Sequence, residues 1–177
     1  MSTPVSRPVH RDRCKGHGGI AVLFTAASSL LAGAEPTDAQ DSPLAWRWTA
    51  VPIHAAAGKE IEIDAAVDIA PGWVLYSSDF TPALFGPRPT KLKLAAAPAY
   101  RADGEVEAIQ AKSGTLKDAS GEAHYKYFSG KGYFKQRVTI LDSSAVAEIR
   151  GVIRGQVCFE EKGVCQLFTQ EFTVAVN

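Results

Sequence analysis

The ten residues from Glu60 to Ile69 alternate between apolar and mostly acidic side chains. An α-helix would scatter the apolar members around its circumference, whereas a β-strand turns successive side chains to opposite faces and gathers them on one. The segment therefore predicts a half-buried strand. Its apolar face would consist of Ile61, Ile63, Ala65, Val67 and Ile69.

Other short runs with strand character follow, separated by turn signals such as Pro71-Gly72 and Ser120-Gly121. They predict further strands at Trp46–Ile53, Val74–Ser77, Thr90–Leu94, Glu105–Ala111, Ala123–Phe128, Tyr133–Leu141, Val146–Val157 and Phe168–Val176. Gln136 interrupts the apolar face of one of them. After the N-terminal segment, no stretch keeps a helical apolar period over three turns. Many short strands in about 140 residues predict an all-β chain folded as an immunoglobulin-like, two-sheet β-sandwich.

The first 34 residues have the character of a secretory signal peptide. Four basic residues precede a 13-residue apolar run that ends in Ala32-Gly33-Ala34, a small-x-small cleavage pattern. The run is shorter than the roughly 20 residues that a membrane-spanning helix needs. We therefore expect cleavage after residue 34, a flexible lead-in over 35–43, and a periplasmic domain over 44–177 that does not itself span a membrane.

Removal of the signal peptide changes both the charge and the cysteine count. The whole chain has 19 basic and 19 acidic residues, and without residues 1–34 it has an excess of three acidic ones. Because there is no basic excess, we expect no nucleic-acid partner. Cys14 leaves with the signal peptide, so one pair remains in a compartment where disulfides persist. His54 and His124 have no Cys or carboxylate at metal-ligand spacing, so we expect no metal and no cofactor.

The remaining cysteines, Cys158 and Cys165, have six residues between them and stand on either side of the polar turn Glu160–Gly163. A hairpin would bring them within bonding reach if their Cβ atoms share a face. The chain-entropy relation gives roughly 2.5 kcal/mol for closing a loop of about eight residues, so the disulfide could be a structural staple. It could equally be a redox pair, and the residues alone leave both interpretations open.

Several motifs in order along the chain carry a resemblance. These are Gly72-Trp73-Val74-Leu75-Tyr76-Ser77, Gly86-Pro87-Arg88-Pro89-Thr90, the aromatic segment Tyr127–Val138, and the cysteine hairpin followed by a last strand. Together, over Trp46 to Asn177, they resemble the N-terminal periplasmic domain of the thiol:disulfide interchange protein DsbD. No single motif is specific, but the ordered set is.

The resemblance implies an immunoglobulin-like fold with a redox-active Cys158/Cys165 pair. Cys165 would form the mixed disulfide with partners, and Cys158 would resolve it. Tyr127 or Phe128 would lie on a cap loop that shields the pair, and Trp73 and Tyr76 would lie beside or under the site. For each of these aromatic residues the alternative is plain core packing.

The resemblance also implies partners. The domain would take electrons from a thioredoxin-like domain fed by a membrane electron carrier and pass them to periplasmic disulfide oxidoreductases. Because the sequence ends at Asn177 without hydrophobic membrane segments, we expect the donor to be a separate polypeptide. Two departures are the absence of proline in Gln166-Leu167-Phe168 and a longer cysteine spacing. The competing hypothesis is a non-catalytic β-sandwich binding domain of the cell envelope with a structural disulfide, so whether the chain is part of an enzyme stays open.

Overall fold

The computed structural model describes residues 42–54, 56–83, 86–118 and 121–176. These residues form ten strands and one 3-10 turn, without an α-helix in the described ranges. The elements are β1 (Leu44–Val51), β2 (Glu60–Ile69), β3 (Trp73–Tyr76), β4 (Lys91–Leu94), β5 (Tyr100–Ala108), β6 (Lys112–Asp118), β7 (Gly121–Ser129), β8 (Lys131–Ile140), β9 (Glu148–Phe159), η1 (Glu160–Lys162) and β10 (Val164–Ala175). The expected signal peptide, Cys14 and most of the expected lead-in lie outside these residues.

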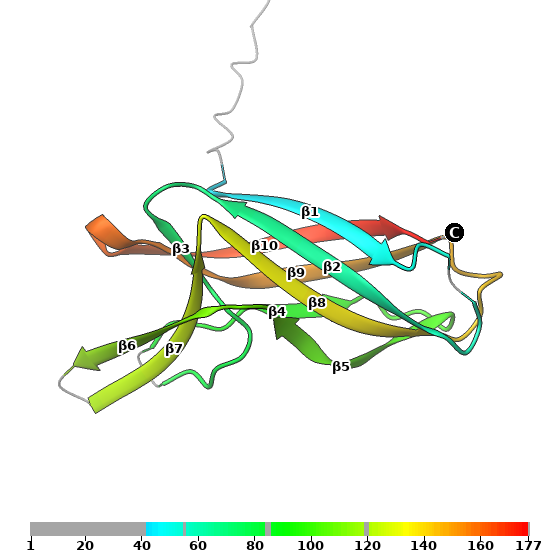
Figure 1. The fold of residues 1–177 in the computed structure, drawn as a ribbon, viewed down its shortest axis with the longest axis horizontal. Helices are drawn as coiled ribbons and strands as arrows, with labels where there is room; N and C mark the ends of the chain where they lie inside the picture. Colours follow the sequence, from blue (N-terminus) through cyan, green and yellow to red (C-terminus); the bar gives the residue numbers. More distant parts are fainter. Residues whose placement is uncertain (1–41, 55, 84–85, 119–120, 177) are drawn as a thin grey trace, which may run out of the picture. The chain divides into compact units, whose positions relative to one another are not determined.

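The strands form two antiparallel layers (Figure 1). One layer runs β1–β2–β8–β5. In the other, β9 pairs with β10 along its whole length, with β4 over its middle and with β3 at its end. β3 then continues the layer to β7 and β6. A tight turn at Gly130 joins β7 to β8 and thereby connects the layers. The fold is the predicted immunoglobulin-like β-sandwich.

Strand β2 confirms the period-2 prediction. Its buried and partly exposed residues alternate without a break, and Ile61, Ile63, Ala65 and Val67 are each at most 1% exposed. β2 lies between β1 and β8, so its backbone is paired on both sides while one side-chain face meets the core.

The core has two clusters of buried apolar side chains. The first cluster includes Ile61, Ile140, Ile149 and Phe172. The second includes Leu75, Phe128 and Val157, which are cross-strand neighbours on β3, β7 and β9. The second cluster therefore lies on the core side of the strands that carry the C-terminal hairpin.

Strand β6 and the first residues of β10 differ from the predictions. The β6 sequence, Lys-Ser-Gly-Thr-Leu-Lys-Asp, has no apolar alternation, and it forms a strand by pairing with β7 alone. β10 begins at Val164 rather than at Phe168, because Gly163 closes the hairpin directly after the 3-10 turn. In both places backbone pairing sets the boundary where side-chain pattern is weak.

Gln136, which interrupts the apolar face of β8, is buried at 2% exposure. Its Nε2 donates hydrogen bonds to the carbonyl oxygens of Asp103 and Gly104, at 3.4 and 3.3 Å, and of Arg137, at 3.0 Å. The first two acceptors lie where the β5–β8 register shifts. The amide thus satisfies carbonyls that the regular ladder leaves unpaired at this irregularity.

Of the described residues, none belongs to a helix that is long and apolar enough to cross a membrane.

Candidate functional site

The C-terminal hairpin brings the two cysteines together. Cys158 near the end of β9 and Cys165 near the start of β10 are direct cross-strand partners, with Cα atoms 4.0 Å apart and their sulfurs joined in a disulfide. Gly163 ends the turn in the left-handed region, with φ of 62°, a conformation that glycine adopts without steric cost. The hairpin predicted from the polar turn is confirmed.

The two cysteines differ in their exposure. Cys158 is only 4% exposed because it lies between β10 and β3, where Val74 is its partner. Cys165 is exposed on β10, the last strand in the order of its layer. Its neighbours Val164 and Leu167 are 54% and 63% exposed. Cys165 is therefore an exposed residue with exposed apolar neighbours, whereas Cys158 is a buried residue inside the layer.

Trp73 flanks the hairpin on β3. It is the cross-strand partner of Phe159, the residue after Cys158, and the two rings meet edge to face with centroids 5.4 Å apart. A Cβ added at Gly72 would stand 2.6 Å from the Phe159 ring, so this close approach requires glycine. Trp73 thus lies beside the cysteine pair, at the end of the hairpin.

Tyr76 belongs to an aromatic cluster next to the hairpin, which we define as Tyr76, Phe80, Tyr125 and Tyr127. Ring centroids of Tyr76 and Tyr125 are 5.5 Å apart, and those of Tyr125 and Tyr127 are 5.9 Å apart. Burial raises the pKa of Tyr76, and the charges of Tyr125 and of Glu160 in the hairpin turn raise it further. The aromatic cluster is therefore close enough to the turn for the Glu160 charge to affect the pKa of Tyr76.

The two residues expected on a cap loop lie within β7. Tyr127 is the cross-strand partner of Tyr76 and is half-buried. Phe128 is the partner of Leu75, is 4% exposed, and contacts Phe134 edge to face in the core. Because alternate residues of a strand face opposite sides, Tyr127 lies on the face of the aromatic cluster and Phe128 on the core face.

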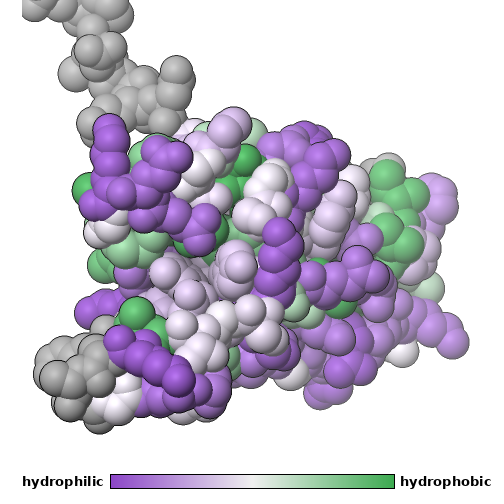
Figure 2. All heavy atoms as spheres, turned by 60° about the vertical axis from the view of Figure 1, so that its left-hand side comes forward, coloured by the Kyte–Doolittle hydropathy of each residue, from purple (hydrophilic) through white to green (hydrophobic). Residues whose placement is uncertain are grey.

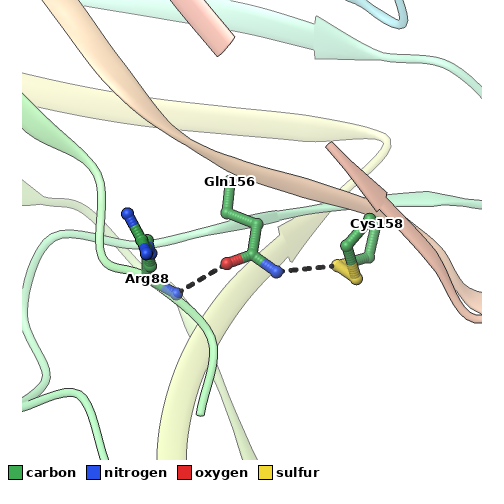
Figure 3. The surroundings of a disulfide bond; sticks show 4 residues. Arg88, Gln156 and Cys158 are labelled. Carbon is green, nitrogen blue, oxygen red and sulfur yellow. Dashed lines mark hydrogen bonds between the residues drawn. A yellow bond between two sulfur atoms is a disulfide. The ribbon is translucent and has the colours of Figure 1, made fainter. Parts of the chain in front are cut away.

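A hydrogen-bonded chain reaches the buried sulfur from the other side (Figure 3). The Gln156 side chain donates from Nε2 to Sγ of Cys158 at 3.5 Å, and its Oε1 accepts the backbone N–H of Arg88 at 3.0 Å. The sequence analysis did not single out Gln156. A signal was present, because a residue two positions before Cys158 on a strand faces the same side, but the contact with Arg88 joins residues 68 positions apart.

The surface beside the hairpin is hollowed. Thr81, Arg88, Arg154, Leu167 and Phe168 are among the residues that line this hollow. Figure 2 turns forward the side of the domain that carries the ends of the β6–β7 and β9–β10 hairpins. It shows pale surface, neither strongly hydrophilic nor strongly hydrophobic, recessed between strongly hydrophilic areas. Within the described ranges, no three His, Cys, Asp or Glu side chains are grouped to hold a metal ion.

The fold and the site together define an immunoglobulin-like β-sandwich with a cross-strand disulfide in its C-terminal hairpin. Residues 42–177 match the family model of the N-terminal region of the thiol:disulfide interchange protein DsbD. The chain therefore belongs to this family.

Solved structures similar to this chain include two N-terminal domains of bacterial proteins. The N-terminal periplasmic domain of ScsB from Proteus mirabilis is 16% identical, with a TM-score of 0.48, over 76% of this chain and 46% of its own. The N-terminal domain of DsbD from Neisseria meningitidis, in the reduced form, is 16% identical, with a TM-score of 0.42, over 70% of this chain and 82% of its own. The chain thus spans about half the length of the ScsB structure. No curated protein sequence gave a match.

Proposed function

We propose that this domain is a periplasmic electron relay that works through the Cys158/Cys165 pair. It would accept electrons from a thioredoxin-like donor, fed by a separate membrane electron carrier, and pass them to periplasmic disulfide oxidoreductases. The proposal includes export through the signal peptide over residues 1–34, as the sequence predicts. Membership of the DsbD N-terminal family supports it.

The observation that carries the proposal is the unequal exposure of the two cysteines. Thiol–disulfide exchange needs in-line access to the sulfur that is attacked or attacks. Cys165 is exposed on an edge strand, whereas Cys158 is 4% exposed. This asymmetry favours Cys165 as the residue that bonds to partners and Cys158 as the residue that resolves the mixed disulfide.

The proposed exchange proceeds by two successive displacements at sulfur. In the reduced domain, the Cys165 thiolate attacks a partner disulfide, forms a mixed disulfide and releases one partner thiolate. The Cys158 thiolate then attacks Sγ of Cys165, closes the disulfide and releases the second partner thiolate. Two electrons pass to the partner, whose thiolates take up two protons. The donor dithiol reduces the domain again by the reverse sequence.

Tyr127 and Phe128 retain a proposed shielding role with different contributions. Tyr127 is half-buried in the aromatic cluster, so a partner could displace its ring without opening the core. Phe128 would act indirectly, by holding β7 against β3 through its core contacts. Trp73 and Tyr76, the first and last residues of β3, would hold in place the strand against which Tyr127 and Phe128 pack.

Trapping experiments test the relay and the assignment of roles. A reduced Cys158→Ser domain is expected to form a stable mixed disulfide through Cys165 with a thioredoxin-like protein that lacks its own resolving cysteine and whose remaining cysteine is activated as a mixed disulfide with thionitrobenzoate, which leaves as the thiolate. The matched Cys165→Ser domain is expected to form none. If only Cys165→Ser traps the partner, the two roles are reversed.

A redox titration decides between the relay and the non-catalytic alternative. We expect the native pair to equilibrate with glutathione buffers and with the thioredoxin-like protein. A reduction potential far below about −300 mV, together with no exchange, would indicate a structural disulfide in a binding domain.

A further inference from the structure

The Gly86–Thr90 segment has contacts that the proposed relay does not explain. Thr90 is 1% exposed, its backbone N–H donates to the Ser77 carbonyl at 2.9 Å, and its hydroxyl donates to the Tyr76 carbonyl. These bonds fasten the end of the segment to the end of β3. Two residues earlier, the N–H of Arg88 donates to Gln156.

The prolines in this segment make Arg88 the one residue of Pro87–Pro89 that can donate from its backbone. Proline lacks an N–H and has a fixed φ, and it also restricts the residue before it. The Pro87–Pro89 stretch is therefore stiff, and the single N–H within it is the one that meets Oε1 of Gln156. With Oε1 occupied as an acceptor, the amide of Gln156 turns its Nε2 donor toward the sulfur of Cys158 (Figure 3).

A hydrogen bond donated to this sulfur differs in strength between the oxidised and the reduced state. The sulfur of a disulfide is a weak acceptor, whereas a thiolate carries a full negative charge, and hydrogen bonds to charged groups are roughly twice as strong as neutral ones. Burial in an apolar environment disfavours a thiolate, and Cys158 is 4% exposed with the apolar Val74 opposite. The titratable or charged residues on the elements next to Cys158 include Cys165 on β10, Tyr76 on β3 and Arg154 on β9, together with Glu160, Glu161 and Lys162 in the turn. Lys162 lies over the Phe159 ring, and Arg88 lies in the segment that contacts Gln156.

We propose that Gln156 is a positioning residue of the exchange reaction, which holds a hydrogen-bond donor on Cys158 so that the resolving thiolate forms inside the layer. The Arg88 N–H, presented between two prolines, fixes which way the amide of Gln156 points. This inference rests on the proposed relay, because a structural disulfide would have no use for a stabilised thiolate.

The first test measures the Cys158 thiolate directly. In a Cys165→Ser background, the ultraviolet absorbance of the thiolate is followed against pH. Gln156→Leu is expected to lower the thiolate fraction near neutral pH about tenfold, the effect of losing one hydrogen bond to a charged group. Gln156→Glu is expected to lower it further, because its carboxylate still accepts the Arg88 N–H but places a negative charge where the donor was.

Matched controls separate this effect from charge and from folding. Gln166→Glu puts the same charge on exposed β10, beside the pair but opposite Val157, and it should leave the Cys158 titration nearly unchanged. Arg88→Ala keeps the backbone N–H and should also have little effect, whereas Arg88→Pro removes the N–H and should act in the direction of Gln156→Leu. Circular dichroism of each variant checks that the fold is retained.

The second test measures the redox equilibrium with both cysteines present. Loss of the donor destabilises the reduced state only where that state holds the thiolate. At a pH above the Cys158 pKa of both domains, Gln156→Leu should therefore shift the equilibrium with glutathione about tenfold toward the disulfide, which is about 30 mV, and the shift should shrink as pH falls and the thiol becomes protonated. An unchanged Cys158 titration in folded Gln156→Leu and Gln156→Glu domains would overturn the inference even if partner exchange is normal. Absent partner exchange with the expected titration shifts would instead overturn the relay and leave the positioning of the sulfur established.

Discussion

Asp79 follows the end of β3 and connects it to β7 through Lys126. Its carboxylate accepts a hydrogen bond from the Ser77 hydroxyl at 2.6 Å and pairs with the Lys126 ammonium. Burial opposes ionisation of Asp79, but these two hydrogen bonds outweigh it and hold its pKa below the ordinary value. Phe80 follows Asp79 in the chain, and Tyr125 precedes Lys126. The Asp79–Lys126 ion pair therefore joins the two segments that carry these members of the aromatic cluster.

Asp79→Asn should therefore change the pH dependence of stability. A carboxylate with a lowered folded-state pKa stabilises the fold above its unfolded pKa of about 3.9, and this contribution disappears as pH falls through the folded pKa. Because both partners are more than a third exposed, we expect a loss of only about 0.5–1 kcal/mol near pH 6. The loss should be smaller at pH 3, because the contribution shrinks once pH falls below the unfolded pKa.

Urea unfolding of the oxidised domain at both pH values measures this difference. Lys126→Met serves as the partner control, since in that background Asp79→Asn should cost less. An equal cost of Asp79→Asn at the two pH values would contradict the assignment.

Tyr127 allows the shielding role to be tested at a single side chain. Tyr127→Ala should speed alkylation of the reduced pair, because it removes a half-buried ring from the face of the aromatic cluster. Phe128→Ala should instead lower the free energy of unfolding by about 3–5 kcal/mol, the usual cost of deleting a core phenylalanine. Alkylation followed by mass spectrometry, with thermal melts alongside, separates the two effects. Unchanged alkylation rates in both folded variants would refute the shield.

At the scale of elements, β9 organises the site because four other segments meet it. β10, β4 and β3 pair with it, and the Gly86–Thr90 segment, which leads into β4, approaches it at Gly155. A Cβ added at Gly155 would stand 2.7 Å from Oγ1 and 3.1 Å from Cα of Thr90, and 3.0 Å from the Phe168 ring. The absence of a side chain at Gly155 is therefore what lets this segment approach β9.

Gly155→Ala should accordingly push Thr90 away from β9 and loosen its hydrogen bonds to the end of β3. We expect the free energy of unfolding to fall by about 1–3 kcal/mol, as for other overpacked core positions. Chemical denaturation of Gly155→Ala, Thr90→Ala and the double variant forms a cycle, and the two changes should be less than additive because they break the same contacts. If the two losses of unfolding free energy are fully additive, the destabilisation by Gly155→Ala does not arise from the Thr90 contacts.

At the scale of the whole molecule, two core clusters hold the sandwich together, and neither requires the disulfide. Cys158 lies outside both clusters, although its strand neighbour Val157 belongs to the second. A relay must keep its fold in both redox states, and this arrangement satisfies that condition.

Reduction of the disulfide should therefore lower stability without unfolding the domain. For a closed loop of about eight residues, the expected loss is roughly 2.5 kcal/mol. Denaturant titrations with and without dithiothreitol measure it, and the Cys158→Ser/Cys165→Ser domain is the control that cannot reoxidise. A β-sheet circular dichroism spectrum that is lost on reduction would contradict the prediction.

Much of the site was predictable because hairpins are local. The polar turn ending in Gly163, with one cysteine on each side, determines that Cys158 and Cys165 lie opposite each other once the strands pair. β6 could not be predicted in the same way, because an exposed edge strand buries little and needs no apolar alternation. Gln136 interrupts the apolar face of β8 in the sequence, yet it is buried, and its side chain donates hydrogen bonds to two carbonyls at the β5 irregularity.

The sequence by itself determined that this protein is a β-sandwich and that Cys158 and Cys165 stand on the two arms of one hairpin. Both follow from short-range rules: alternation of side chains along a strand, and the reach of a tight turn. Only the tertiary structure decided that Cys158 is buried and Cys165 exposed, that Phe128 rather than Tyr127 faces the core, and that Gln156 links Arg88 to Cys158. These features depend on which distant segments are packed together, and side-chain pattern along one strand carries no record of that.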